Sequence, residues 1–476
     1  MATGESLISM IDVGQKVISY LHADPAAKKA FEVLSPYGDI FAVGGAPRDV
    51  ILGKKPKDVD LMAKVPAETI QEVLSKVPGG HLNFAGKNFG VFHFHYGGGQ
   101  VEIALPRLEQ STGAGHKDFD VKAHHDIPLE QDLPRRDFTG NAIAVNLKTG
   151  QMVDPLGGAL DLSLGLMRHT NPNAFKDDPL RIVRGLTMRS RHGLEPVPET
   201  AQAMAEHGPL LKHLPGDRFR EEMDKIMKGQ DPHHAMRMAK DMGLLEHFLP
   251  EVHNTVGFDQ KNPYHQLPLD DHLMQVLENT SALTGDHDVR LAALLHDIGK
   301  PASQWVDEKG IGHYYKGKDG QGDDHETVGA RMAEDLMRRW NYSAPRINRV
   351  TNLIQNHMFP EFNSPKGARK FLNRVGSIDA AHDLLNLRQA DHTGKGNEAA
   401  TAGMVNKMRG LVNQEENRAV LGIQDLAISG RDVMKVLNIP PGPEVGQKMK
   451  MLFDYVLEHP ELNTRQQLLT ILQNLR

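Results

Sequence analysis

The sequence predicts an α+β head, a small β-sheet with helices, followed by an all-helical body. Three observations lead to this fold class. Within residues 38–155, short apolar runs are separated by Gly, Pro and Asn, and their length and alternation are typical of strands. From Asp178 onward, apolar residues recur at three- and four-residue spacing, which predicts helices. The chain has 476 residues, more than one compact core accommodates, so several domains are expected.

The elements are expected in a definite order along the chain. Residues 1–35 predict a polar helical lead-in. The predicted strands of the head are 39–43, 58–62, 90–95 and 101–105. A helix is predicted directly after Arg135-Arg136, a Gly-punctuated connector at 156–166, and a helical face at Met236, Ala239, Met242 and Leu245. Loops are predicted at 316–324, 395–397 and 439–443.

Composition excludes several classes of protein. No run of about 18 apolar residues occurs, so no membrane span is expected. The first ten residues lack the basic and apolar regions of a secretory signal. The absence of cysteine excludes disulfides and cysteine-based zinc sites, and it is compatible with the reducing cytoplasm, where we expect the protein. A net charge of -6 means that any nucleic-acid surface must be a local patch. Nothing in the sequence identifies a protein partner.

A glycine pair follows the first predicted strand. Gly44 and Gly45 would let backbone N–H groups approach a phosphate chain, and Arg48, one turn into the next helix, can fork onto phosphate oxygens. Asp58 and Asp60 lie two apart on a predicted strand, so their carboxylates share one face and can hold Mg²⁺ at a phosphoryl centre. Taken singly, these pieces are equally an ordinary turn and a solvated strand end. Their combination favours a phosphate and metal site.

Four more charged residues extend this site. Glu102, on a later predicted strand, is either a third carboxylate of the metal site or an exposed strand residue. Arg135 and Arg136 are adjacent and suit a triphosphate. Asp137 can orient an arginine, or it can cap the predicted helix.

A second pair lies at the start of a later helix. Asp178 and Arg181 are three apart and therefore share one helix face. A carboxylate accepts from an exocyclic amine and an arginine donates to ring atoms, so the pair can read the edge of a base. The alternative is a capping Asp with an i,i+3 ion pair. Arg184, Arg189 and Arg191 add a local basic stripe along the same segment.

These segments resemble the CCA-adding tRNA nucleotidyltransferases of the bacterial and eukaryotic class, within the nucleotidyltransferase and poly(A) polymerase superfamily. The matching segments are GGAPRD at 44–49, LG at 52–53, DVD at 58–60, RRDFTGNA at 135–142, DPLGG at 154–158 and DDPLRIVR at 177–184. The resemblance implies a nucleotidyltransferase fold with a mixed sheet, catalytic Mg²⁺ at Asp58 and Asp60, and tRNA, CTP and ATP as substrates. It implies nucleotide contacts from Gly44, Gly45, Arg48, Arg135, Arg136, Asp137 and Arg184. Asp178 and Arg181 would act as a protein template that selects CTP and then ATP.

The chain departs from the family's pattern at two positions. Asp177 stands where the family usually has Glu, and Thr187 stands where it usually has Arg. Arg189 is a candidate to replace that missing arginine. The polar stretch 111–133 corresponds to a flexible loop that the family needs for the final A, which argues against an enzyme that adds only CC.

Histidines and acidic residues form a second pattern in the helical part. An adjacent His-Asp pair on an apolar helix is costly to bury without a partner, and a metal supplies one, although a satisfied core histidine is the alternative. A divalent transition metal or Mg²⁺ is expected on His272, His296, Asp297 and Asp391, with His325 and His357 as accessory residues. The string HDIGK at 296–300 resembles the HD phosphohydrolase domain, and NPYHQ at 262–266 is similar to CCA-adding enzymes that carry one. The resemblance implies hydrolysis of 2′,3′-cyclic phosphates and related phosphoesters.

Four domains are expected: a nucleotidyltransferase head with its N-terminal helix at 1–165, a helical nucleotide-recognition neck and RNA-binding region at 166–260, a helical HD domain at 261–400, and a helical tail at 401–476. Residues 428–446 resemble the tail that holds the tRNA elbow in this family. The predicted function is Mg²⁺-dependent addition of CCA to tRNA without a nucleic-acid template, with additional phosphohydrolase activity. One alternative is a poly(A) polymerase or a partial CC- or A-adding enzyme. The other is a metal phosphohydrolase whose head only binds RNA.

Overall fold

The computed structural model describes residues 10–85, 90–111, 119–261, 267–315, 321–393, 398–416 and 422–474. The chain divides into two compact units, Met1–Phe248 and Leu249–Arg476, which are described separately. Several expectations lie outside the described residues: the first nine residues of the lead-in, the segments 262–266 and 395–397, and parts of the stretches 111–133 and 316–324. The division into four domains therefore stays a prediction.

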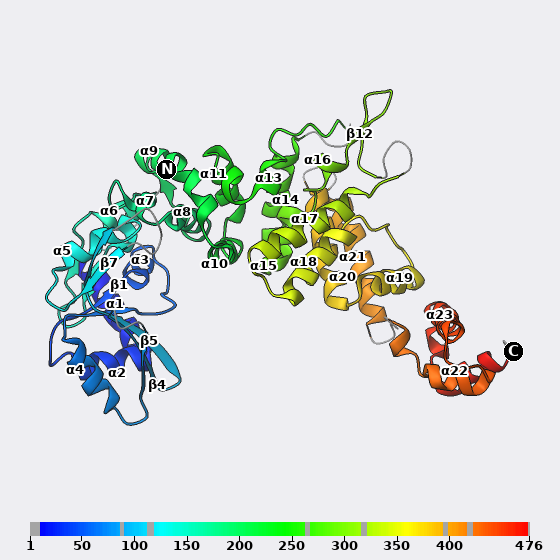
Figure 1. Ribbon diagram of the computed structural model, residues 1–476, viewed down its shortest axis with the longest axis horizontal. Helices are drawn as coiled ribbons and strands as arrows, with labels where there is room; N and C mark the ends of the chain where they lie inside the picture. Colours follow the sequence, from blue (N-terminus) through cyan, green and yellow to red (C-terminus); the bar gives the residue numbers. More distant parts are fainter. Residues whose placement is uncertain are drawn as a thin grey trace. The chain divides into compact units, whose positions relative to one another are not determined.

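The first unit carries a sheet with helices around it (Figure 1). Its described helices are α1 (Met10–Ala23), α2 (Pro25–Leu34), α3 (Gly45–Ile51), α4 (Ala67–Ser75), α5 (Leu129–Asp132), α6 (Gly158–Ser163), α7 (Ala174–Asp177), α8 (Leu180–His192), α9 (Pro198–His207), α10 (Gly216–Met227), α11 (Pro232–Asp241) and α12 (Leu245–Phe248). The strands of the sheet are β1 (Ile40–Val43), β2 (Leu61–Ala63), β3 (His81–Ala85), β4 (Val91–Tyr96), β5 (Gly99–Ala104), β8 (Ala144–Asn146) and β9 (Met152–Val153). Two smaller ribbons pair β6 (Arg107–Ser111) with β7 (Phe119–Ala123), and β10 (Leu166–Met167) with β11 (Glu195–Pro196).

The sheet is mixed, as the sequence predicts. Its strand order is β3-β4-β5-β2-β1-β8-β9. Strands β2 and β5 pair in parallel, with Leu61 beside Ile103, whereas the other neighbouring strands pair antiparallel. The parallel pair is central to the function, because residues in register on parallel neighbours project from the same face.

The two faces of the sheet are covered differently. On one face, apolar side chains of α1, α2 and α4 pack against alternate strand residues such as Leu61, Phe92 and Ile103. On the other face, a smaller cluster joins Phe41, Val43 and Met62 to the segment 129–144. Strand alternation therefore assigns the residues just before Leu61 and Ile103 to this second, less covered face.

The second unit is mainly helical. Its described helices are α13 (Pro250–His253), α14 (Leu269–Leu283), α15 (His287–Leu295), α16 (Lys300–Ser303), α17 (His325–Arg339), α18 (Ala344–Asn356), α19 (Pro365–Val375), α20 (Ile378–His392), α21 (Glu398–Glu415), α22 (Gly430–Leu437), α23 (Pro443–Glu458) and α24 (Arg465–Asn474). A short hairpin of β12 (Trp305–Val306) and β13 (Gly312–His313) interrupts them. Helices α22, α23 and α24 share a separate apolar cluster around Val433, Leu452 and Leu468.

Several local predictions are wrong. Asp58 and Asp60 precede β2, which begins only at Leu61, although the carbonyl of Asp60 already accepts from the amide of Val43 in β1. The α-helix predicted directly after Arg136 is not formed. Arg136 itself has an extended backbone, and a short 3₁₀ turn follows at Thr139–Asn141.

Three further segments differ from the prediction. The connector 156–166 contains α6, because the carboxylate of Asp154 accepts from the first amides of that helix. The helical spacing at 236–245 spans two helices, since α11 ends at Asp241 and Gly243 has a φ of 68°. The sequence also missed β3, β6, β7, β8 and β9, as well as the two ribbons inside the helical part.

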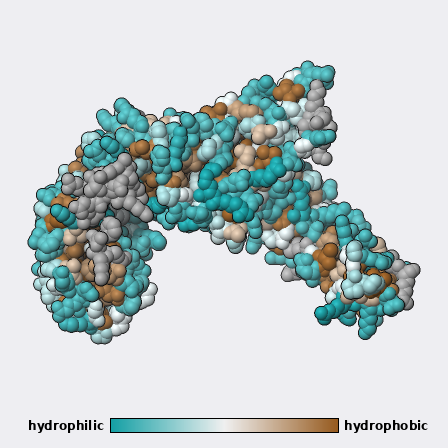
Figure 2. Space-filling model, in the orientation of Figure 1, coloured by the Kyte–Doolittle hydropathy of each residue, from teal (hydrophilic) through white to brown (hydrophobic). Residues whose placement is uncertain are grey.

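The surface is mixed in character. Figure 2 shows hydrophilic residues over most of the visible face, with hydrophobic residues in small separate patches. Among the described residues, no helix is both long enough and apolar enough to cross a membrane.

Candidate active sites

Three carboxylates meet on the less covered face of the head sheet. Because Leu61 pairs with Ile103, the preceding residues Asp60 and Glu102 lie side by side at the start of the parallel pair. Asp58 lies two residues before Asp60, with the buried Val59 between them. The structure thus brings together the three residues that were predicted as catalytic.

The electrostatics of this group call for a cation. The pKa of Asp60 is raised to about 6, first by partial burial and then by the negative charges of Glu102 and Asp58, while Arg136 acts in the opposite direction. A divalent cation would offset this repulsion, and carboxylate oxygens are the ligands that Mg²⁺ prefers. The residues present therefore fit a magnesium site.

Arg136 links these carboxylates to the glycine turn. Gly44 has a φ of 68°, and a Cβ built there would lie 3.1 Å from Nη1 of Arg136, so the glycine allows the guanidinium to approach closely. The fully buried carboxylate of Asp132 lies 2.9 Å from Nε of Arg135 and 3.8 Å from Nε of Arg136. One acidic residue therefore holds both arginines in place.

Asp137 orients an arginine rather than capping a helix. Its buried carboxylate lies 2.9 Å from Nη2 of Arg184 and accepts from Nδ2 of Asn141 and the amide of Phe138. Burial opposes ionisation, but Arg184, Asn141 and Phe138 hold the pKa of Asp137 below its usual value. Asn141 in turn accepts from Nη1 of Arg48. Arg48, Asn141, Asp137 and Arg184 therefore form one polar network.

A small basic cavity of about 100 Å³ lies next to this network. It is lined by Arg48, Asp137, Asn141, Arg184, Thr187, Met188, Arg191, His192, Glu222 and Lys225. Burial and then the charges of Arg48, Lys54 and Arg191 lower the pKa of His192 to about 3. Burial is the larger cause, but the contribution of these three cations shows a positive potential at the cavity, which suits a polyphosphate.

The predicted replacement arginine lies elsewhere. Nη2 of Arg189 is 2.9 Å from Oε1 of Glu195, and Arg189 does not line the basic cavity. Thr187 lines that cavity and donates to the buried Glu222, which also pairs with Lys225 at 2.7 Å. Arg191, which belongs to the predicted basic stripe, and Lys225, which sequence reasoning missed, are the extra cations here.

The contacts of Asp178 and Arg181 are compatible with both interpretations of the pair, a helix cap with an ion pair and a reader of the base edge. Oδ1 of Asp178 accepts from the amide of Leu180, and Oδ2 lies 4.0 Å from Nε of Arg181, as a cap and an ion pair require. The guanidinium of Arg181 also donates to the carbonyls of Ala174 and Arg135, which holds it firmly. A guanidinium has five N–H donors, so these contacts are compatible with further donation to a base.

The second unit brings together all six residues predicted for the histidine site. Around the carboxylate of Asp297, Nε2 of His272, His296, His325 and His357 lie at 3.6, 3.2, 3.3 and 3.5 Å. Asp391 lies 3.1 Å from Nε2 of His272. Contrary to the prediction, His296 and Asp297 are not within a helix, since α15 ends at Leu295 and the pair occupies the turn that follows.

The orientation of the imidazoles fits metal ligation. Nδ1 of His296, His325 and His357 faces the carbonyls of Ala293, Tyr314 and Ile354, at 2.8, 3.2 and 2.7 Å. A carbonyl can only accept, so each Nδ1 carries a proton, and Nε2 is the ring atom that faces the cluster and is left to ligate a metal. Among the described residues, Nε2 of His296 and of His325 and Oδ1 of Asp297 are buried without a hydrogen-bond partner. A metal would satisfy these atoms.

A cavity of about 370 Å³ opens onto this cluster. Although burial opposes ionisation, His296 and Lys300 hold the pKa of Asp297 well below its usual value, so this carboxylate is charged at neutral pH. Two overlapping sets of ligand atoms are close enough for one ion: His272, His296 and Asp391, and His296, Asp297 and His357. The mixed nitrogen and oxygen donors suit a divalent transition metal.

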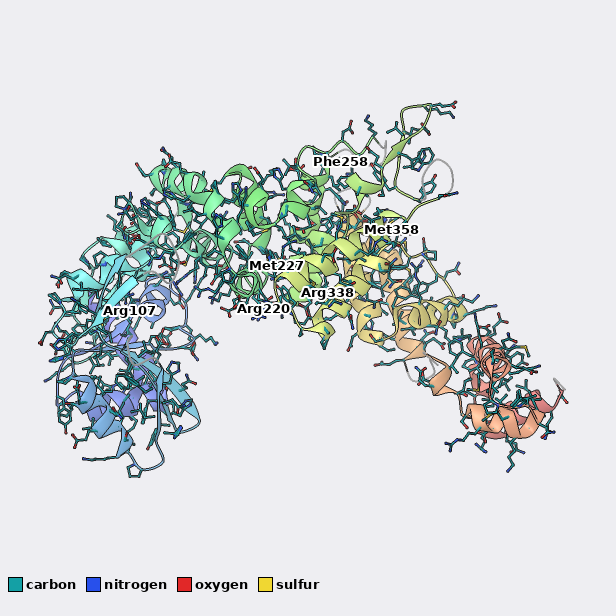
Figure 3. All side chains as sticks on the ribbon, viewed as in Figure 1. Arg107, Arg220, Met227, Phe258, Arg338 and Met358 are labelled. Carbon is teal, nitrogen blue, oxygen red and sulfur yellow. The ribbon has the colours of Figure 1, made fainter. Side chains whose placement is uncertain are left out.

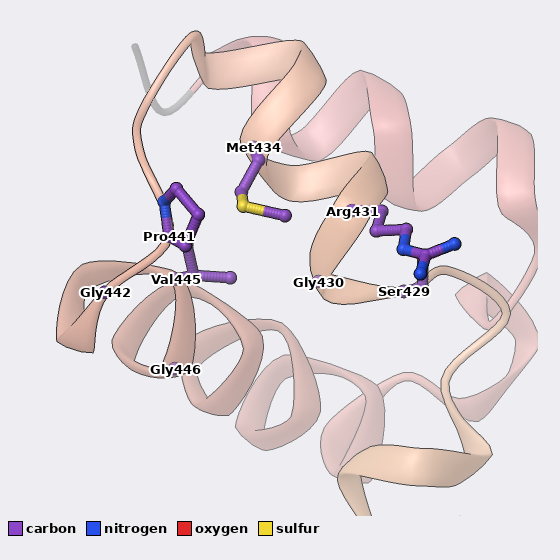
Figure 4. Close-up of a pocket in the computed structure, with 8 residues that line it drawn as sticks. All are labelled: Ser429, Gly430, Arg431, Met434, Pro441, Gly442, Val445 and Gly446. Atoms are coloured by element: carbon purple, nitrogen blue, oxygen red, sulfur yellow. The ribbon is translucent and has the colours of Figure 1, made fainter.

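A separate pocket of about 630 Å³ lies between α22 and α23 near the C-terminus (Figure 4). It is lined by Ser429, Gly430, Arg431, Met434, Pro441, Gly442, Val445 and Gly446. Figure 4 shows Arg431 projecting from the start of α22 beside the glycine backbone. The segment that resembles the tRNA-elbow tail thus carries an arginine and closely approachable backbone.

Three family models match parts of the chain. A poly A polymerase head domain matches residues 40–168, a "probable RNA and SrmB-binding site of polymerase A" matches 193–255, and an HD domain matches 269–392. The three lie in the order that the sequence predicts.

Curated relatives and solved structures agree with these models. A multifunctional CCA protein of Nitrosococcus oceani is 33% identical over 351 residues, which are 71% of this chain and 80% of that protein. A multifunctional CCA protein of Nitrosospira multiformis is 34% identical over 63% of this chain and 68% of its own length. The Bacillus stearothermophilus CCA-adding enzyme in complex with CTP shares the fold, with a TM-score of 0.65 at 21% identity over 94% of this chain and 96% of that one. A Thermotoga maritima CCA-adding enzyme complexed with tRNA gives a TM-score of 0.52 at 19% identity over 96% and 98%.

Proposed function

This chain belongs to the family of multifunctional CCA proteins, the CCA-adding tRNA nucleotidyltransferases, and we propose that its head catalyses CCA addition at Asp58, Asp60 and Glu102. The observation that carries this assignment is the parallel register of β2 and β5, which gathers three carboxylates beside Arg136 and the glycine turn. Asp58 and Asp60 are the proposed Mg²⁺ ligands. CTP, ATP and tRNA are the proposed substrates.

The proposed reaction forms a bond between the tRNA 3′ oxygen and the α-phosphorus of the nucleotide, and it breaks the bond to the leaving pyrophosphate. Bound Mg²⁺ supplies activation of the hydroxyl and offsets developing charge. Arg48 and Arg184 would hold the triphosphate at the basic cavity, and Arg135 and Arg136, which Asp132 holds in place, would add further contacts to the nucleotide. Asp137 would keep Arg184 in position through their 2.9 Å contact. Catalysis then rests on positioning and electrostatics.

The proposed template is the pair Asp178 and Arg181. Replacing Arg181 with alanine should relax the choice between CTP and ATP more than it weakens tRNA binding, because the base edge would lose its donor. Single-nucleotide incorporation kinetics with each of the four NTPs would measure this. Arg184→Ala is the matched control, since that variant should slow all nucleotides alike. An Arg181→Ala protein that loses rate equally for all four NTPs and keeps its selectivity would contradict the template role.

The histidine site is the proposed phosphohydrolase centre. Asp297, His272, His296 and Asp391 would hold the metal, with His325 and His357 around them, and 2′,3′-cyclic phosphates and 2′-nucleotides are the proposed substrates. The metal supplies an activated water for attack on phosphorus. The tail pocket at Arg431 would contact the tRNA backbone, since duplex RNA is bound mainly by shape and phosphate contacts.

The proposed function is tested by extension of a tRNA transcript that lacks CCA. With CTP alone the product should grow by two nucleotides, and with CTP and ATP together by three. A run of A residues from ATP alone would indicate a poly(A) polymerase, which the match to a poly A polymerase head domain keeps open. A product that stops after two C residues, or an enzyme that adds only A, would indicate a partial activity. No extension, together with hydrolysis of cyclic phosphates, would favour a phosphohydrolase with an RNA-binding head.

A further inference from the structure

An aromatic cluster lies at the cavity of the histidine site. It comes from the hairpin of β12 and β13, in which the ring of Trp305 stacks on His313 with centroids 4.3 Å apart and an interplanar angle of 26°. The ring of Tyr315 stands edge-on to His313 at 5.5 Å. None of these rings belongs to the predicted metal ligands.

Hydrogen bonds hold Tyr315 in place. Nε2 of His313 lies 2.9 Å from the carboxylate of Asp307, and the hydroxyl of Tyr315 lies 3.2 Å from Nδ1 of the same imidazole. A carboxylate accepts, so His313 donates from Nε2 and accepts the tyrosine proton at Nδ1. Asp307 also accepts from the amides of Lys309 and Ile311, so its carboxylate, the first member of this series of hydrogen bonds, is fixed in the hairpin turn. The tyrosine ring is therefore preorganised.

The cavity has a charged floor and an apolar rim. Asp297, His325 and His357 line it on the metal side. Tyr315 and Met358 line it as well, and they are 60% and 55% exposed, although large apolar side chains are usually buried. Figure 3 labels Met358, which directly follows His357. A volume of about 370 Å³ lies in the range of small-ligand sites.

We propose that Tyr315 recognises the base of the substrate: the base stacks on the tyrosine ring while the phosphate ester lies at the Asp297 cluster. The inference rests on the proposed phosphohydrolase function and adds the residue that recognises the base of its substrates. An aromatic ring stacks on every base, so Tyr315 selects for a base without distinguishing among bases. Phosphoesters that lack a base would reach the same cluster but bind more weakly.

The test compares two cyclic phosphates on the full chain loaded with Mn²⁺. Adenosine 2′,3′-cyclic phosphate carries a base, whereas glycerol 1,2-cyclic phosphate presents the same five-membered phosphate ring without one. Tyr315→Ala should raise KM for the adenosine compound by about ten-fold and leave KM for the glycerol compound unchanged. Tyr315→Phe keeps the ring and should retain most of the preference. Tyr455→Ala removes an exposed tyrosine of α23 and should change neither value.

Binding gives a second readout that does not need turnover. Trp305 lies beside the cavity, and the other tryptophan, Trp340, is 1% exposed, so quenching by a bound base would report on Trp305. If the wild-type protein hydrolyses neither compound, the phosphohydrolase proposal fails. Quenching by adenosine 2′,3′-cyclic phosphate that weakens about ten-fold in Tyr315→Ala would still support the base site. The base site would be overturned if Tyr315→Ala changed KM equally for both compounds, or if it changed neither KM nor the quenching.

Discussion

Replacing Asp60 with asparagine is expected to lower the rate of CTP addition to tRNA by about a thousand-fold or more, because the variant loses a metal ligand at the reacting phosphorus. Single-turnover incorporation of labelled CTP measures the rate. Glu68→Gln, which changes an exposed carboxylate on α4 of the same head, should keep the wild-type rate. A wild-type rate in Asp60→Asn would show that the cluster of Asp58, Asp60 and Glu102 is not the catalytic site.

The same variant should not be destabilised without Mg²⁺. The pKa of Asp60 is raised to about 6 from an ordinary value of 3.8, so the folded state binds this proton more tightly than the unfolded state does. In metal-free protein, this group therefore lowers the stability of the wild type as pH rises from about 4 through 6. Asp60→Asn removes the ionisable group, so its Tm relative to the wild type should increase over this window. A Tm that falls in the variant at pH 7 would show that its lost activity reflects misfolding.

Replacing Asp297 with asparagine is expected to abolish hydrolysis of 2′,3′-cyclic phosphates, again by about a thousand-fold or more, while CCA addition stays within about two-fold of the wild type. Asp297 contacts the Nε2 atoms of all four histidines of the cluster, and asparagine would remove its charge. Metal content by mass spectrometry should fall together with the hydrolysis. Asp335→Asn, on an exposed position of α17, serves as the control and should retain metal and activity.

One outcome would contradict this account of the histidine site. Full metal content and full hydrolysis in Asp297→Asn would exclude the cluster as the hydrolytic centre. Because a buried charge is changed, helix content by circular dichroism and CCA addition should be measured on the same sample. His325→Gln provides a milder variant in which one imidazole is replaced, and it should lose metal affinity with the fold intact.

Much of the head could be predicted because its signals are local. The strand before Gly44, the glycine turn, and the spacing of Asp58 and Asp60 can all be recognised within about twenty residues. The role of Glu102 could not be resolved in this way. Its place depends on β5 pairing in parallel with β2, and strands β3 and β4 come between them along the chain. Long-range register is set by packing of the whole sheet, which local patterns do not encode.

The segment around Arg135 and Arg136 shows why local propensity fails. A helix was expected there, but the buried Asp132 and the network of Asp137, Asn141 and Arg48 hold the backbone in a 3₁₀ turn and an extended stretch. The spacing of apolar residues does not reveal where polar side chains will bond to the backbone in place of helical hydrogen bonds. Asn141 lies inside the RRDFTGNA segment, and Asp132 lies four residues before Arg136, so motif and spacing could have indicated both.

The histidine site was predictable in its residue types but not in its geometry. All six residues were predicted, but their distances were not, since His272 and Asp391 lie on α14 and α20, more than a hundred residues apart. The aromatic hairpin beside the cavity carried no recognised signal, because the stacking of Trp305 on His313 depends on the pairing of β12 with β13. Lys225 was missed for a similar reason, since its place beside Arg191 in the basic cavity depends on how α8 packs against α10.

The most direct test of the central claim is a crystal structure of the protein with CTP and Mg²⁺. The account predicts a metal ion held by Asp58 and Asp60, next to Glu102, with the triphosphate along Arg48 and Arg184. A triphosphate bound in another place, or Asp58 and Asp60 turned to opposite sides with no metal between them, would contradict the account.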